Sequence, residues 1–387
     1  MSLNLDNSEW QRVAFGDVVR NANETVKDAA ALGIDRVVAM EHMDPGKLAI
    51  ARWGEVANGT TFTRRVRPGQ TLFGKRRAYQ RKVAFAEFDA ICSGDIYTFE
   101  ADETQLRGEF LPFLVQSDAF FDHALDTSAG SLSPRTHWRD LANFQFNLPP
   151  LDEQKRIADL MWTIGHHHDS LAAMPREIEV AYDDWLKSRT EGLPTRPLAD
   201  VLELQHGRPV PSALYGKGNF PLLRPGDMNA DGSVAWSDSS VRIPQQFVDQ
   251  HQNWVLDSGD LVINMTAQSL EDRFLGRVCR MHDRALLNQR IGRLTMKDHI
   301  TTDFAFVALH SASFAEWVAR RSEGSKVKHL HWRHIEDYPF PTPPADQQAV
   351  IVAESNAWSV GVQRLKTEAS RLVALRSSVL AEVFGGI

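Results

Sequence analysis

Cysteine is scarce in this chain, with two residues, Cys92 and Cys279, among 387. Two cysteines cannot supply the four thiolates of a four-cysteine zinc site, so that class of site is excluded. The two residues lie in nearly equivalent places of the two halves of the chain. We expect both to be buried, reduced thiols rather than a disulfide, which fits a cytoplasmic protein.

Several functional classes are missing their sequence signals. No apolar run approaches the roughly 20 residues that a membrane-spanning helix needs. The N-terminus has no basic segment followed by an apolar one, so we expect no secretory signal and no contact with a membrane. No glycine-rich phosphate-binding motif follows a predicted strand. The net charge of −7 means that any nucleic-acid surface must be a local patch on a mildly acidic protein.

What the sequence does contain is one long internal duplication. Residues 148–192 align without a gap with residues 342–386, at an offset of 194. Each copy opens with two prolines, continues as an apolar-periodic helix and ends at a glycine. A period of this length indicates a duplicated domain with its helix, because solenoid repeats are much shorter.

The duplication predicts an α+β fold made of two mixed α/β domains and two long helices. The predicted boundaries are 1–149 for the first domain, 150–193 for the first helix, 194–343 for the second domain and 344–387 for the second helix. Short alternating apolar segments in each domain are typical of strands. Residues 110–121 differ from these segments, because their apolar residues recur with a helical period.

Apolar residues recur in the two long helices with the alternating spacing of four and three that is typical of a coiled coil. These seam positions are Ile157, Ile164, Leu171, Ile178 and Trp185 in the first copy and Ile351, Trp358, Leu365, Leu372 and Val379 in the second. Two apolar stripes of equal length would bury each other most simply as an antiparallel pair. Pro175 should kink or interrupt the first helix.

The segment 64–82 carries eight basic residues and no acid. They are Arg64, Arg65, Arg67, Lys75, Arg76, Arg77, Arg81 and Lys82, interleaved with Phe73 and Tyr79. Like charges without a partner nearby in sequence repel one another unless an anion meets them. The segment therefore predicts DNA contact, although a solvated basic loop would have the same composition.

Two loops of small and hydroxyl residues add further candidates for DNA contact. In the first half the candidates are Ser131, Ser133 and Arg135, and in the second half they are Ser325, Lys326, Lys328 and His329. Serine and threonine are frequent phosphate contacts, while ordinary loops have the same residues. The counterpart of the basic segment in the second half is polar and mixed, with Thr266, Gln268 and Arg273 as candidates. The two halves thus predict two readers with different targets.

Two motifs imitate catalytic or metal sites. The three histidines at 166–168 point about 100° apart on a helix, so they cannot converge on one metal ion. Glu153-Gln154-Lys155 has the shape of a nuclease motif but has no paired upstream aspartate, and the second copy lacks it. We therefore predict no catalytic residue and no metal site.

The doubled plan, the junction Phe146–Ala158 and the small-residue loop at 127–131 together resemble the DNA specificity subunit of type I restriction-modification systems. The second junction departs from the first by having Gln347 where the first has Glu153. The resemblance covers essentially the whole chain. It implies two target recognition domains that each read one half of a bipartite, asymmetric sequence in double-stranded DNA, and a helix pair that spaces them.

The resemblance also implies partners and cofactors. The helix pair would dock two methyltransferase subunits, and restriction and translocase subunits would join through them. S-adenosylmethionine, and ATP with Mg²⁺, would be used by those partners, while this chain would bind no cofactor. Two other functions are kept as alternatives: a DNA-modifying or DNA-cleaving enzyme acting alone, and a coiled-coil scaffold that does not bind DNA.

Overall fold

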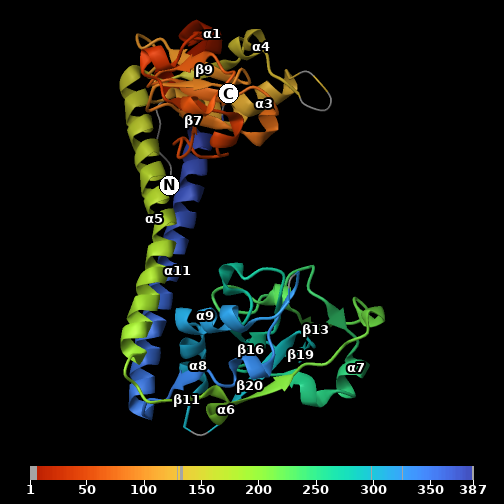
Figure 1. The fold of residues 1–387 in the computed structure, drawn as a ribbon. Coiled ribbons are helices and arrows are strands. Elements are labelled where there is room, and N and C mark those ends of the chain that lie inside the picture. The colour runs from red at the N-terminus through yellow and green to blue at the C-terminus, as the bar shows by residue number, and fades with distance from the viewer. Residues whose placement is uncertain (1–6, 129, 131–133, 298, 325, 386–387) are drawn as a thin grey trace. The chain divides into compact units, whose positions relative to one another are not determined.

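The computed structural model describes residues 7–385 apart from 129, 131–133, 298 and 325. The chain divides into two units, one of Met1–Ala172 with Lys366–Ile387 and the other of Ala173–Leu365. Each unit holds one globular domain and one part of each of two long helices (Figure 1). We call the globular segment before the first long helix domain 1 and the segment between the helices domain 2.

Domain 1 contains two four-stranded sheets, ordered β2-β9-β6-β7 and β4-β3-β8-β5. The strands are β2 (Val19–Asn21), β3 (Arg36–Val38), β4 (Gly54–Glu55), β5 (Arg64–Val66), β6 (Thr71–Gly74), β7 (Val83–Phe85), β8 (Ala90–Cys92) and β9 (Ile96–Ala101). The pair β3 and β8 is parallel. The turn at residues 67–70 connects β5 to β6.

Domain 2 repeats this plan strand for strand. Its sheets are ordered β12-β20-β16-β18 and β14-β13-β19-β15, and β13 and β19 form the parallel pair. The strands are β12 (Leu202–His206), β13 (Phe220–Leu223), β14 (Arg242–Ile243), β15 (Val255–Leu256), β16 (Leu261–Asn264), β18 (Val278–Arg280), β19 (Ala285–Leu287) and β20 (Ile291–Met296). The duplication seen in the sequence therefore extends through the topology of both domains.

Short helices complete each domain. The helical period at residues 110–121 belongs to two helices, α2 (Leu111–Gln116) and α3 (Asp118–Asp126), rather than one. The break falls at Ser117, whose side chain accepts a hydrogen bond from Phe120 N and caps α3. Domain 2 has the matching pair α8 (Thr302–Leu309) and α9 (Ala312–Arg321).

A two-stranded ribbon closes each domain where the chain enters a long helix. In domain 1, β1 (Gln11–Ala14) pairs with β10 (Gln145–Leu148), and in domain 2, β11 (Thr195–Pro197) pairs with β22 (Pro339–Pro341). Prolines follow both closing strands and cannot donate to a sheet, so the strands stop there and the helices begin. Each domain is thereby joined to its helix without a free linker.

The long helices are α5 (Leu151–Thr190) and α11 (Ala345–Phe384), with 40 residues each. In the first unit, the start of α5 packs on the end of α11, where Ile157 and Met161 share a core with Val379 and Val383. In the second unit, the end of α5 meets the start of α11. All ten predicted seam residues are buried or half-buried. The predicted α+β class, with two mixed domains and long antiparallel helices, is confirmed.

One prediction about these elements is excluded in part and another is wrong. Of the kink or interruption predicted at Pro175, the interruption does not occur, because helix α5 continues through this position. The two cysteines are buried and free, as expected. Their places are not equivalent, because Cys92 lies in β8 of the sheet β4-β3-β8-β5, whereas Cys279 lies in β18 of the sheet β12-β20-β16-β18, which corresponds to the other sheet of domain 1. None of the helices among the described residues contains an apolar stretch of the length that spanning a bilayer requires.

Candidate nucleic-acid interface

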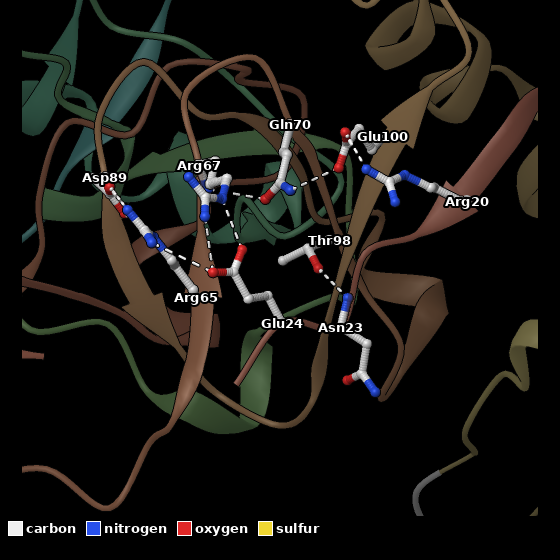
Figure 2. A network of polar contacts seen from close by, with 9 residues as sticks. All are labelled: Arg20, Asn23, Glu24, Arg65, Arg67, Gln70, Asp89, Thr98 and Glu100. Carbon is white, nitrogen blue, oxygen red and sulfur yellow. Dashed lines mark hydrogen bonds and ion pairs between the residues drawn. The ribbon is translucent and has the colours of Figure 1, made fainter. Parts of the chain in front are cut away.

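The basic segment of domain 1 is divided by strand alternation into two faces. Arg65 and Arg67 share one face, and both bind Glu24: Arg67 Nε donates to Glu24 Oε2 over 2.7 Å, and Arg65 also pairs with Asp89 over 2.5 Å (Figure 2). These bonds lower the pKa of Glu24, with the side-chain hydrogen bond from Arg67 as the largest cause. The segment has no acid of its own, as the sequence indicates, but folding brings acids from distant segments to these two cations.

The end of the basic segment is also held internally. Arg81 pairs with Asp118 over 2.5 Å, and its guanidinium lies 4.6 Å from the ring centre of Phe121. Lys82 Nζ donates to Met40 O over 2.7 Å. These two side chains attach the loop after β6 to the rest of domain 1, which leaves them fewer donors for an external anion.

One acid, Asp95, lies between Arg76 of the segment and Arg135 of the small-residue loop. Arg76 Nη1 lies 3.7 Å from Asp95 Oδ2, and Arg135 Nη2 lies 3.2 Å from Asp95 Oδ1. Arg64 Nη1 donates to the carbonyl of Ile96 over 2.5 Å, one residue away from this acid. The cluster therefore keeps a local excess of positive charge, in contrast to the neutralised face of Arg65 and Arg67.

A single β-bridge brings the two predicted DNA-contact segments of domain 1 together. Arg76 and Arg135 face each other across this antiparallel bridge. On one side of it Arg77 N donates to Pro134 O over 2.8 Å, and on the other Thr136 N donates to Lys75 O over 3.0 Å. The basic segment and the small-residue loop, which are remote in sequence, are thus one surface. Ser131 and Ser133 lie outside the described residues.

A short helical turn, Ala78–Gln80, projects beside this bridge. It is flanked by Arg77 and Arg81, whose φ angles of 55° and 52° are left-handed. Left-handed backbone at residues other than glycine costs free energy and is concentrated at functional sites. Tyr79 is 55% exposed at the tip of the turn, and the Arg77 side chain is exposed and has no partner among the described residues. Both are available to a ligand.

Lys75 lies beneath this surface. Its ammonium lies 5.2 Å from the ring centre of Tyr97, and burial lowers the pKa of Lys75, with Arg64 adding to the effect. The Tyr97 hydroxyl donates to Thr136 O over 3.1 Å. A lysine crowded by cations gains from the arrival of an anion, because the anion relieves their repulsion.

Domain 2 builds the same bridge with different residues. Strand β17 (Thr266–Ala267) pairs with β21 (Lys328–His329), so that Thr266 faces His329 and Ala267 faces Lys328. Lys326 is exposed, as is Gln268 in the loop that follows β17. The two predicted segments of domain 2 are thus also one surface, with weaker charge on it. Ser325 lies outside the described residues.

Arg273 does not belong to this exposed set. Its guanidinium pairs with Asp183 of helix α5 over 2.5 Å, and Glu179 lies 3.7 Å away. The hydrogen bond to Asp183 is the largest cause of the raised pKa of Arg273. Arg273 therefore fastens domain 2 to its helix, which sequence reasoning could not foresee because the partner acid is remote in the chain.

Two residues next to these bridges were missed in the sequence. Asp95 and Arg290 stand in the turns before β9 and β20, and their carbonyls accept from Lys75 N and Met265 N. An isolated acid or arginine in a turn gives no signal in the sequence. Only the register of the strands shows that each one borders a bridge.

The long helices leave an apolar groove of about 710 Å³ in the second unit. It is lined by Ile178, Trp185, Glu354, Ala357, Trp358, Gly361, Val362, Arg364 and Leu365. The rings of Trp185 and Trp358 lie 6.3 Å apart, and Trp185 Nε1 donates to Glu354. Four of the predicted seam residues thus face a hollow that the helix pair does not fill.

The residues that imitated catalytic sites have structural partners. His167 Nε2 lies 3.1 Å from Glu368 of helix α11, and Glu153 pairs with Arg156 over 2.6 Å. In the part of the chain that the structure describes, no group of three or more histidine, cysteine, aspartate or glutamate residues could hold a metal ion.

Comparisons with known proteins agree on one family. The model of the type I restriction modification DNA specificity domain matches residues 7–180 and again residues 191–353. The chain is 21% identical over 246 residues to the type I restriction enzyme MjaVIII specificity subunit of Methanocaldococcus jannaschii, covering 57% of each protein. It is 32% identical over 89 residues to the EcoDI specificity subunit of Escherichia coli, which is 23% of this chain and 19% of that one.

Solved structures share the fold. The chain covers 98% of a chain from a study of complex assembly and conformational transition of the type I restriction-modification system, with 19% identity and a TM-score of 0.66. It covers 97% of the HsdS subunit of Thermoanaerobacter tengcongensis, with 19% identity and a TM-score of 0.51. It also covers 99% of the S subunit of M. genitalium, with 14% identity and a TM-score of 0.54. The coverage values apply equally to this chain.

Proposed function

Because this chain belongs to the type I restriction modification DNA specificity family, we propose that it selects the DNA sequence on which a methylating and restricting complex acts. The observation that carries this proposal is the repeated bridge. Arg76 with Arg135 and Thr266 with His329 occupy the same place in two domains of the same topology. One architecture with two different surfaces suits the reading of two unlike half-sites.

The two surfaces differ in charge as well as in shape. Domain 1 presents guanidinium groups, which bind phosphates and can form paired hydrogen bonds with guanine. Domain 2 presents a threonine, a histidine and two lysines at the matching place. We infer that the target is bipartite and asymmetric, since surfaces of such different chemistry would not favour the same bases.

The helix pair is proposed to space the two readers and to dock two methyltransferase subunits. The groove beside Trp185 and Trp358 supports this role, because buried aromatic residues are the usual anchors of protein interfaces. Restriction and translocase subunits would join through the methyltransferases. S-adenosylmethionine, ATP and Mg²⁺ would belong to those partners, and the assembly would act on DNA in the cytoplasm.

The proposal is tested by mapping modified bases in the genome of the source cell with this gene intact and deleted. Loss of one split motif with two unlike halves is the expected result. Loss of a single continuous motif would contradict two readers. An unchanged map, together with no binding by the full chain and its methyltransferase to pools of random duplexes at low salt, would favour the scaffold alternative.

A second measurement separates a specificity subunit from an enzyme that acts alone. The purified full chain is incubated with duplexes carrying the mapped motif, S-adenosylmethionine and Mg²⁺, with and without its methyltransferase. Methyl transfer is expected only when the partner is present. Modification or cleavage by the chain alone would overturn the proposal.

A further inference from the structure

Asp95 and Arg290 occupy the same turn in the two domains. Asp95 lies between β8 and β9, and Arg290 lies between β19 and β20. The backbone N–H of Asp95 donates to Ser93 Oγ over 3.2 Å, and that of Arg290 donates to Asn288 Oδ1 over 3.2 Å. An oxygen-bearing side chain two residues earlier thus shapes both turns in the same way.

The backbone bonds that join these turns to the bridges are also the same. The carbonyl of Asp95 accepts from Lys75 N over 3.0 Å, and that of Arg290 accepts from Met265 N over 2.9 Å. On the other side of Lys75 and Met265, Thr136 N and Leu330 N donate to their carbonyls over 3.0 and 2.9 Å. Since the backbone bonds match, Asp95 and Arg290 occupy equivalent positions beside the two bridges.

The charge at this position is opposite in the two domains. In domain 1 the Asp95 carboxylate holds Arg76 and Arg135, which face each other across the bridge and would otherwise repel. In domain 2 the facing residues are Thr266 and His329. Arg290 is exposed there, and its side chain has no ion pair or hydrogen bond among the described residues.

We propose that this one position decides how each domain presents positive charge to DNA: Asp95 positions the guanidinium groups of Arg76 and Arg135, and Arg290 contacts DNA directly. The inference rests on the proposed DNA-reading function and gives Asp95 and Arg290 separate roles in it. A carboxylate facing DNA is unfavourable in itself, because it repels phosphates. Its value lies in fixing two long side chains before binding, which lowers the entropy lost when they engage bases.

The first test concerns Arg290 and uses the full chain with its methyltransferase. Binding to the mapped target is measured over a range of salt concentrations for Arg290→Ala and for the matched control Arg284→Ala. Arg284 is an exposed arginine of the same domain that is paired with Asp257 over 2.9 Å. Arg290→Ala should weaken binding about tenfold and reduce the salt slope by about one, the size expected for one arginine contact. Arg284→Ala should leave both unchanged.

The second test concerns Asp95 and reads base preference rather than affinity alone. Asp95→Asn removes one negative charge, so binding to random duplexes should become slightly tighter. Selection from a randomised pool should nevertheless show a loss of preference at the half-site read by domain 1, while the other half-site is unchanged. Asp95→Glu, which keeps a carboxylate, should restore much of the preference.

The outcomes that overturn the inference are distinct from those that overturn the proposed function. A wild-type complex that binds no duplex refutes the proposed function and this inference with it. A wild-type complex that binds its target, with Arg290→Ala equal to Arg284→Ala, refutes the role of Arg290 alone. Tighter binding of Asp95→Asn with unchanged preference at both half-sites would show that Asp95 is an ordinary surface acid. Thermal melts identify any variant that is unfolded.

Discussion

Gln154 and Gln348 make the same set of hydrogen bonds at the starts of the two long helices. Gln154 Nε2 donates to the carbonyls of Pro149 and Gln105, and its Oε1 accepts from Arg107 N. Gln348 Nε2 donates to Pro343 and His299, and its Oε1 accepts from Thr301 N. Both side chains are completely buried. Each glutamine therefore locks the first turn of its helix to the domain that precedes it.

The attachment of the second long helix to domain 2 should weaken when the amide donor of Gln348 is removed. Gln348→Glu replaces an amide that donates two hydrogen bonds by a carboxylate that donates none, leaving two carbonyls unpaired. The expected loss is about 1–3 kcal/mol in the free energy of unfolding, measured by denaturant titration of the full chain. Gln347→Glu is the matched control, since Gln347 is the exposed neighbour in the same turn. Equal stability of the two variants would refute the lock.

Substitutions on the two faces of the basic segment should have different effects on DNA binding. Arg77→Ala removes an exposed cation without a partner, so DNA affinity and its salt slope should both fall. Arg67→Ala removes a cation held by Glu24, so it should lower the melting temperature and leave the salt slope nearly unchanged. Titration of one labelled target duplex at several salt concentrations gives both quantities. A larger fall in the salt slope for Arg67→Ala would reverse this assignment.

The Glu24 network should make stability depend on pH in a defined direction. The bonds from Arg67, followed by the charges of Arg67 and Arg65, lower the pKa of Glu24 in the folded protein. A lowered pKa stabilises the fold above the unfolded value of about 4.3, and this stabilisation is lost as pH falls through the folded value. Glu24→Gln should therefore melt below the wild type at pH 7, and the difference should shrink under acidic conditions. Glu87→Gln, at an exposed position, should match the wild type throughout.

The two thiols should be unreactive toward thiol reagents in the folded protein. Burial raises the pKa of Cys92 and of Cys279 to about 12, so almost no thiolate exists at pH 8. The thiolate is the reactive form, so modification by a thiol reagent should be very slow until denaturant exposes both residues. Mass spectrometry counts the modified residues with and without denaturant. Rapid labelling of either one without denaturant would show that its strand opens readily.

The proposed spacer role predicts how the target changes when the helices are shortened. Deleting one heptad from each helix, residues 168–174 and 362–368, keeps the seam in register because the deletions match under the duplication. Seven residues are about 10 Å of helix, so the gap between half-sites should shrink by about three base pairs. The selected target sequence gives the gap directly. Deleting the heptad from one helix alone should disrupt pairing, and an unchanged gap after both deletions would contradict the spacer.

The overall plan of this protein can be predicted from its sequence. The offset of 194 residues revealed the duplication, and apolar spacing revealed both long helices and their seam, because these features depend on residues close together in the chain. The helical period at residues 110–121 was also recognisable in the sequence. At position 175 the local pattern allowed a kink or an interruption, and the structure excludes only the interruption, because the helix continues through the proline.

Which cations remain unpaired depends on contacts that form only in the folded protein. Arg67 is bound by Glu24, 43 positions earlier in the chain, and Arg273 by Asp183, 90 positions earlier, whereas Arg77 and Arg290 have no such partner among the described residues. A charge run in a sequence shows the cations but not the acids that folding brings to them. Strand register, which no local pattern fixes, also decided that Asp95 and Arg290 stand at one position with opposite charge. The sequence thus predicts that two readers exist, and the fold determines which side chains are left to read.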